Sequence, residues 1–178
     1  TIKSGGGDDV INLTEATGSK SVDHINLSLT AANGNDVITG FTFGSGGDEI
    51  DVELLGAGNM ATETAVAAGA AAQVLGDATQ TLYVFADGAT ATSGGTEVIA
   101  DYTDLTDVLA FLNEAITVSA SDDDGVAIIN DLVNDKAYVY NMEIDGTGDT
   151  AIDSIVLHAT LTADTADTVF TTDNSVIA

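Results

Sequence analysis

Short stretches in which apolar and polar residues alternate recur through the first 55 residues of the chain. Four of them start at an aspartate: Asp9-Val-Ile-Asn-Leu13, Asp23-His-Ile-Asn-Leu27, Asp36-Val-Ile-Thr-Gly40 and Asp48-Glu-Ile-Asp-Val52. Alternate residues of a β-strand face the same side, so the isoleucine of each stretch is expected to face a core. The aspartates follow one another after 14, 13 and 12 residues. A strand at each such interval predicts stacked parallel strands, the pattern of a solenoid, over residues 1–55.

The remaining residues, 56–178, predict a mixed β cap with one or two helices, so the whole chain is expected to be mainly β. The Ala-rich stretch at about 60–75 favours a helix, although Gly69 weakens it. Over 101–116, apolar residues recur at helical spacing on one stripe, which predicts an amphipathic helix. Strands are predicted at 81–88, at 125–130 and 136–142 as a hairpin, at 152–161 beside it, and weakly within the tail.

The charge of the chain excludes several classes of partner. There are 29 acidic residues against three lysines and no arginine, which gives a net charge of -26 over 178 residues. Binding to nucleic acid or to an anionic membrane needs several cationic contacts, so both are excluded. Most carboxylates must instead be solvated, screened by salt or bound to cations, because their mutual repulsion opposes the compact state. Cysteine is absent, which excludes disulfides and thiolate metal sites.

Glycine-rich, acid-rich turns precede three of the four stretches: SGGGDD, ANGND and GSGGDE. Glycine allows positive φ, which lets a turn direct its carbonyl oxygens inward. Carbonyl and carboxylate oxygens are the ligands of Ca²⁺, which takes six to eight of them at about 2.3–2.6 Å. The turns therefore predict bound Ca²⁺, although the same residues also dominate ordinary turns. The predicted metal-binding residues are Gly5, Gly7, Asp8, Asp9, Asp23, Gly34, Asn35, Asp36, Gly47, Asp48 and Asp51.

These turns resemble the RTX repeat family of bacterial secreted proteins, whose nonapeptide reads Gly-Gly-x-Gly-x-Asp-x-aliphatic-x. The repeat is matched at Gly7, Asp9 and Ile11, with Gly5 in the second glycine position, and again at Gly34, Asp36 and Ile38. The resemblance implies a short parallel β-roll with Ca²⁺ between its coils. In that arrangement Asp9 and Asp36 supply carboxylates, and Gly7 and Gly34 supply carbonyls. The unit at Asp23 lacks the glycines, and the spacing of the units exceeds the nine residues of the family repeat.

Two further stretches are similar to parts of the same family. DVITGFTFGSGGDEIDV, residues 36–52, resembles the element that ends the β-roll in serralysin-type and S-layer-type members. Its matching residues are Phe41, Gly47, Glu49, Ile50 and Asp51. The last residues, Asp173-Asn-Ser-Val-Ile-Ala178, resemble the C-terminal signal of type I secretion substrates, an acid followed by aliphatic residues. The specific likeness covers about the first third of the chain.

From this resemblance we expect the calcium-binding, calcium-folded C-terminal domain of a type I secreted bacterial surface protein, S-layer-like and structural in role. Its expected partners are calcium ions, the type I secretion machinery and copies of itself in a surface lattice, and its expected location is secreted or at the cell surface. Two alternatives remain open. One is the export and folding module of a secreted enzyme, such as a serralysin-like protease or a lipase. The other is the terminal domain of an adhesin or a carbohydrate-binding module.

Other polar residues are less specific. SDDDG at 121–125 is interpreted as a solvated turn, with a cation site as the alternative. The loop that starts at Asp145 begins like an EF-hand but has Val156 where the bidentate glutamate belongs. His24 and His158 are the only histidines, and no nucleophile elbow or zinc-hydrolase spacing accompanies them. We therefore expect no enzymatic activity within this chain.

Overall fold

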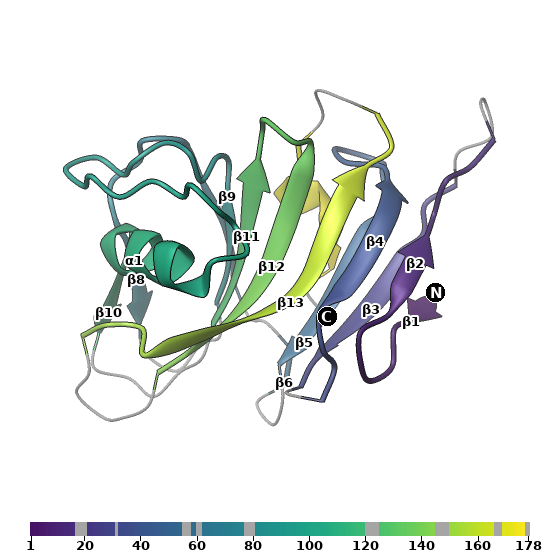
Figure 1. Cartoon of the computed structure of the whole chain (residues 1–178), viewed down its shortest axis with the longest axis horizontal. Helices are drawn as coiled ribbons and strands as arrows, with labels where there is room; N and C mark the ends of the chain where they lie inside the picture. Colours follow the sequence, from purple (N-terminus) through teal and green to yellow (C-terminus); the bar gives the residue numbers. More distant parts are fainter. Residues whose placement is uncertain are drawn as a thin grey trace.

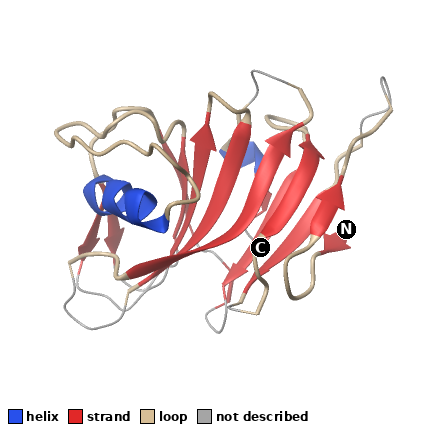
Figure 2. Ribbon diagram, viewed as in Figure 1, coloured by secondary structure: helices blue, strands red, loops and turns tan. Residues whose placement is uncertain are grey.

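A seven-stranded mixed β-sheet forms the centre of the fold (Figures 1 and 2). The computed structural model describes residues 1–16, 21–30, 32–54, 58–59, 62–76, 81–119, 125–144, 150–165 and 169–176. The strands of the large sheet lie in the order β2-β4-β13-β12-β11-β9-β7. A second sheet has the order β1-β3-β5-β14, with β6 paired to β5, and a third pairs β8 with β10.

The bounds of the elements are as follows. The strands are β1 Ile2–Lys3, β2 Val10–Asn12, β3 His24–Leu29, β4 Asp36–Phe41, β5 Glu49–Leu54, β6 Gly58–Asn59, β7 Thr62–Val66, β8 Gln73–Gly76, β9 Thr81–Phe85, β10 Ile116–Ser119, β11 Gly125–Asp131, β12 Lys136–Glu143, β13 Ser154–Ala163 and β14 Ser175–Val176. The helices are α1 Leu105–Ala115 and the 3-10 turn η1 Thr172–Asn174. None of the described helices is long and apolar enough to cross a membrane.

Each face of the large sheet packs against its own hydrophobic core. On one face, Leu82, Val84 and Ile128 share a core with residues of the second sheet, such as Ile25 and Ile50. The side chains that alternate with them belong to the other core, which includes α1, β8 and β10. Figure 2 shows α1 on that side of the sheet. Because both faces are covered, the central strands are buried at every position and mostly apolar: all five residues of β9 and all seven of β11 are buried.

The expectation of a mainly β protein is confirmed, but the expected parallel solenoid is wrong. The first strands do alternate between two sheets: β1, β3 and β5 pair in parallel in one, and β2 and β4 pair in parallel in the other. The stack does not continue, however, because β13 pairs in parallel with β4 and antiparallel with β12. The apolar side chains of Ala159 and Leu161 in β13 thereby complete the core beside β4. The result is a mixed sheet and not a β-roll.

The helix predicted at about 60–75 is also wrong. This stretch forms β7, which pairs in parallel with β9, and β8, which pairs in parallel with β10. Thr62, Thr64 and Val66 are β-branched residues that favour a strand, and Gly69 adopts φ +67° in the turn between the two strands. An Ala-rich composition was therefore outweighed by β-branched residues and by a glycine that breaks the helix.

The helix predicted at 101–116 and the hairpin are confirmed. Helix α1 begins after Asp104, whose carboxylate accepts the Thr106 N–H at 2.9 Å, and it buries Val108, Phe111 and Leu112. Strands β11 and β12 pair antiparallel, with Asp135 at φ +52° in their connection, and β13 lies antiparallel beside β12 as predicted.

Candidate cation-binding turns

The predicted metal-binding residues fall into two groups at opposite ends of β4. We call residues 5–9 with 32–36 the first turn pair, which precedes β2 and β4, and we call residues 42–48 the second turn, which joins β4 to β5 (Figure 1). The first turn pair contains Gly5, Gly7, Asp8, Asp9, Gly34, Asn35 and Asp36. Gly47 and Asp48 belong to the second turn, and Asp23 lies beside it. Asp51 lies within β5, where its carboxylate accepts the Asn26 Nδ2–H at 2.9 Å.

Backbone hydrogen bonds hold the two loops of the first turn pair together. Gly7 N–H donates to the Ala32 carbonyl at 2.8 Å, and the Asp8 carboxylate accepts the Asn35 N–H at 2.9 Å. Gly34 has φ +75°, and a Cβ on it would lie 2.7 Å from the Gly7 carbonyl carbon. Only glycine fits this position, because both the left-handed backbone and the close approach exclude a side chain.

The aspartates that open the strands form a ladder. The Asp36 carboxylate accepts the Asp9 N–H at 3.0 Å, and the Asp48 carboxylate accepts the Asp23 N–H at 2.9 Å. In return, the Asp9 carbonyl accepts the Val37 N–H and the Asp23 carbonyl accepts the Glu49 N–H, each at 2.8 Å. The repeated aspartate therefore has a structural role, since its carboxylate satisfies a backbone donor at the start of the neighbouring strand.

The first turn pair contains two buried side-chain oxygens without a hydrogen-bond partner, Asp9 Oδ2 and Asn35 Oδ1. Gly5 lies near the first of them, since a Cβ on Gly5 would be 3.9 Å from Asp9 Oδ2. The neighbouring Asp36 is fully buried, and its second oxygen is 3.3 Å from Asn33 Nδ2. Burying an unpaired carboxylate oxygen is costly. These oxygens are hard donors of the type that Ca²⁺ prefers, so the residues present fit such an ion.

His158 lies against the first turn pair, which the sequence did not predict. It is the extra residue at the register shift of β13 opposite Val139 and Tyr140, and it is 1% exposed. Burial lowers the pKa of His158, while its hydrogen bond to the Gly34 backbone and the nearby Asp36 carboxylate act in the opposite direction. Its Nδ1 atom is buried without a partner. No local signal links His158 to Asp36, because strand pairing alone brings β13 beside β4.

In the second turn, protein donors already satisfy the polar groups. Asp48 is 2% exposed, and its two oxygens accept the N–H groups of Asp23 at 2.9 Å and Thr42 at 2.7 Å. Burial raises the pKa of the Asp48 carboxyl, and these two hydrogen bonds oppose the shift. Asn174 donates through Nδ2 to three backbone carbonyls of the turn, as detailed below. The two groups therefore differ: among the described residues, buried side-chain oxygens lack a hydrogen-bond partner in the first turn pair but not in the second turn.

The other residues considered for chemistry, the histidine at 24 and the two acidic loops, are not part of either turn group. His24 is half exposed, and its Nδ1 lies 2.9 Å from Glu49 Oε2. Residues 121–124 and 145–149, which carry the two alternative acidic loops, lie outside the described residues. Within the described ranges, no three His, Asp or Glu side chains form a ready-made metal centre. A cation at the first turn pair would therefore need backbone carbonyls as well as carboxylates.

No family model, curated protein or solved structure matches the chain.

Proposed function

We propose that the chain is a calcium-binding structural domain of a secreted bacterial surface protein, and that Ca²⁺ bound at the first turn pair stabilises its folded state. The observation that carries this proposal is the pair of buried, unpartnered oxygens at Asp9 and Asn35 beside the buried Asp36. The ligands would come from the carboxylates of Asp9 and Asp36, the amide oxygen of Asn35 and carbonyls of the glycine-rich loops. Calcium would neutralise charge where the backbone of two loops is pressed together.

The net charge of the chain supports the same proposal. At a net charge of -26, mutual repulsion opposes folding, and three lysines can neutralise at most three of the 29 acids. An ion that binds only the folded state stabilises it by RT ln(1 + [L]/Kd). With the Kd of about 10⁻⁴ to 10⁻³ M typical of extracellular modules, about 10 mM Ca²⁺ contributes about 1.4 to 2.7 kcal/mol per site. This is a large part of the stability of a marginal domain.

The surface role follows from the same chemistry. Calcium that folds the domain outside the cell would leave it unfolded before export, when the free Ca²⁺ concentration is far below the Kd. Carboxylates that remain exposed would bind further ions between neighbouring copies, so the proposed assembly is a calcium-bridged surface lattice. Mixing the folded chain with Ca²⁺ and measuring particle size tests this part separately.

The test of the calcium site is the substitution Asp9→Asn, with Asp104→Asn as the matched control. Each removes one negative charge, and Asn is as good an N-cap as Asp, so the control leaves α1 intact. Thermal unfolding is measured by circular dichroism in about 10 mM Ca²⁺ and in chelator. For the wild type and for Asp104→Asn, we expect Ca²⁺ to raise Tm by about 3 to 10 °C for a chain of this size.

The Tm of Asp9→Asn should differ from that of the wild type in opposite directions in chelator and in Ca²⁺. In chelator it removes a half-buried negative charge whose Oδ2 has no hydrogen-bond partner, so its Tm should equal or exceed that of the wild type. In Ca²⁺ it lacks a ligand, so most of the calcium-dependent rise should disappear. Equal wild-type Tm values with and without Ca²⁺ would refute the proposal, as would an undiminished calcium response in Asp9→Asn.

A further inference from the structure

The C-terminal segment reaches back to the turn that follows β4. We call residues 169–176 the strap. They contain η1 and β14, and β14 pairs in parallel with β5. Asn174 is fully buried at the inner end of the strap, and it contacts the second turn, 130 residues earlier in the sequence. The strap therefore depends on polar contacts with a turn of the kind that the sequence predicts to bind a cation.

The amide of Asn174 lies where three carbonyl oxygens of the second turn converge. Its Nδ2 is 2.8 Å from the Asp48 carbonyl, 3.1 Å from that of Gly44 and 3.4 Å from that of Thr42. Its Oδ1 accepts the Gly44 N–H at 2.7 Å and the Thr171 N–H at 3.1 Å. An NH₂ group has only two protons to share among three acceptors. A ring of inward-facing carbonyls around one electropositive group is also the arrangement that binds Ca²⁺.

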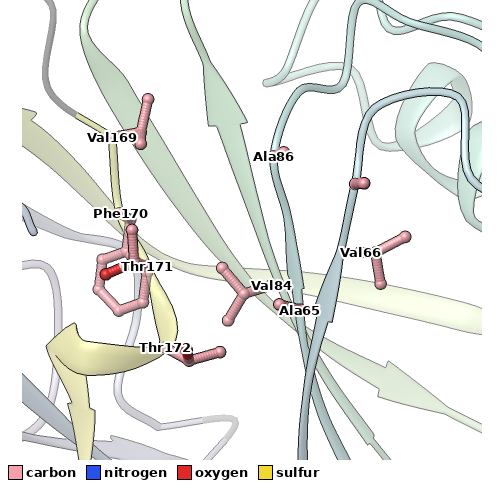
Figure 3. A pocket seen from close by; sticks show the side chains of 9 residues that line it. Ala65, Val66, Val84, Ala86, Val169, Phe170, Thr171 and Thr172 are labelled. Carbon is pink, nitrogen blue, oxygen red and sulfur yellow. The ribbon is translucent and has the colours of Figure 1, made fainter.

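The strap packs against the core through Phe170, which is 2% exposed, but it leaves a space beside it. Phe170 contacts Phe41 and Phe43, with ring centroids 6.0 and 6.1 Å apart, and its backbone bonds to Asn130 in β11. Between the strap and strands β7 and β9 there is a cavity of about 240 Å³ with apolar walls (Figure 3). Its lining includes Ala65, Val84 and Ala86 on the sheet side and Val169 to Thr172 on the strap side. A segment that leaves such a space can detach more easily than a close-packed strand.

We infer that the Asn174 amide occupies a cation position in the second turn, so that docking of the strap and binding of Ca²⁺ at this turn exclude each other. This inference rests on the proposed function for the chemistry of the turns and extends it to their regulation. With the strap docked, Ca²⁺ binds only at the first turn pair. With the strap detached, the carbonyls of Thr42, Gly44 and Asp48 lose the Asn174 donor, and the buried Asp48 carboxylate adjoins them. The Thr42 and Gly44 carbonyls keep one backbone hydrogen bond each, from the Asp48 and Gly47 N–H groups, which leaves their second lone pair for a cation. The second turn then binds one ion more, and that ion holds the strap open.

The test counts bound Ca²⁺ per chain by isothermal titration calorimetry for the full chain and for Asn174→Ala. The control is Asn113→Ala, which removes the two hydrogen bonds that the exposed Asn113 side chain forms with the Ile152 backbone, far along the chain from the second turn. We expect one more ion in Asn174→Ala than in the wild type, and no change in Asn113→Ala. An unchanged count in a folded Asn174→Ala chain would overturn the inference.

A second variant covers the case in which Asn174→Ala does not fold. Asn174→Asp has almost the same shape but directs an oxygen, in place of an NH₂ group, at the three carbonyls. At neutral pH, where the carboxylate is ionised, a bound cation relieves that repulsion, so Asn174→Asp should lose protection from hydrogen exchange over residues 42–48 in chelator and regain it in Ca²⁺. If its exchange is the same in chelator and in Ca²⁺, the amide does not stand in a cation position.

The Asp9→Asn background separates this inference from the proposed function. The ion count of Asp9→Asn against the wild type reports on the first turn pair alone. The count of the double variant Asp9→Asn/Asn174→Ala against Asp9→Asn reports on the second turn alone. A gain of one ion in the second comparison supports the inference even if the first comparison shows no loss, and no gain overturns it whatever the first comparison shows.

Discussion

Asn130 connects the strap to the large sheet, and its removal should destabilise the whole domain. It is 1% exposed in β11. Its Nδ2 donates to the carbonyls of Phe85 at 2.8 Å and Phe170 at 3.0 Å, and its Oδ1 accepts the Phe170 N–H at 2.9 Å. Asn130→Ala removes all three of these hydrogen bonds to backbone groups. At about 1 kcal/mol net per hydrogen bond, the loss is about 3 kcal/mol, and the desolvation of unpaired groups adds to it.

The assay is thermal unfolding in chelator, so that calcium binding does not contribute. A loss of about 3 kcal/mol corresponds to a fall in Tm of about 6 to 12 °C for a chain of this length. Asn130→Asp provides the companion measurement, because it has almost the same volume but replaces two donors with a buried negative charge. It should be at least as destabilising as Asn130→Ala.

Two results would refute this reasoning. A Tm within 2 °C or so of the wild type for Asn130→Ala would mean that the three backbone groups find other partners at little cost. A clearly more stable Asn130→Asp than Asn130→Ala would mean that loss of volume, and not loss of the hydrogen bonds to Phe85 and Phe170, dominates the change. Limited proteolysis gives a local check, since both variants should be cleaved near the strap before the rest of the chain.

Two further predictions concern single positions. Burial raises the pKa of the Glu63 carboxyl above its ordinary 4.5, so the folded state loses stability as the pH rises from 4.5 through the folded pKa. Glu63→Gln should therefore unfold at a higher temperature than the wild type near neutral pH and lose that advantage below pH 4.5. A constant difference in Tm between the two proteins across this pH range would contradict the raised pKa. Gly34→Ala should lower the free energy of unfolding by more than the roughly 1–2 kcal/mol of a left-handed alanine, because its Cβ also meets the Gly7 backbone. Gly94 has φ +95° but open space around it, so Gly94→Ala should lose only the backbone contribution. Equal denaturant midpoints for the two variants would show that the contact with Gly7 has no effect.

Local patterns predicted those elements whose neighbours in the sequence are also their neighbours in space. The amphipathic stripe of α1 and the apolar alternation of β11 and β12 required no distant partner, and both elements form where expected. The glycine-rich turns could also be predicted from the sequence, because a positive φ, as at Gly34, and a close contact between loops both require glycine. The calcium ions that these turns predict stay a prediction.

Long-range pairing accounts for the failures. The four similar strands predicted a solenoid, yet the edge of β4 pairs with β13, whose sequence carries no repeat. The Ala-rich stretch predicted a helix, but β9 offers β7 a parallel strand partner. The same reason hides His158 and Asn174, since each reaches its turn from more than a hundred residues away. A repeat in the sequence therefore predicts which residues form the same local hydrogen bonds, but it does not predict which strands pair.

The distance in sequence between the second turn and its asparagine has a consequence for biosynthesis. A ribosome makes the chain from its N-terminus, so Gly44 emerges 130 residues before Asn174. Until Asn174 has been made, the carbonyls of Thr42, Gly44 and Asp48 lack the amide that donates to them in the folded chain, and loops of this length close slowly. Completion of the second turn is therefore a late folding step, and a chain truncated before the strap would be unable to complete it.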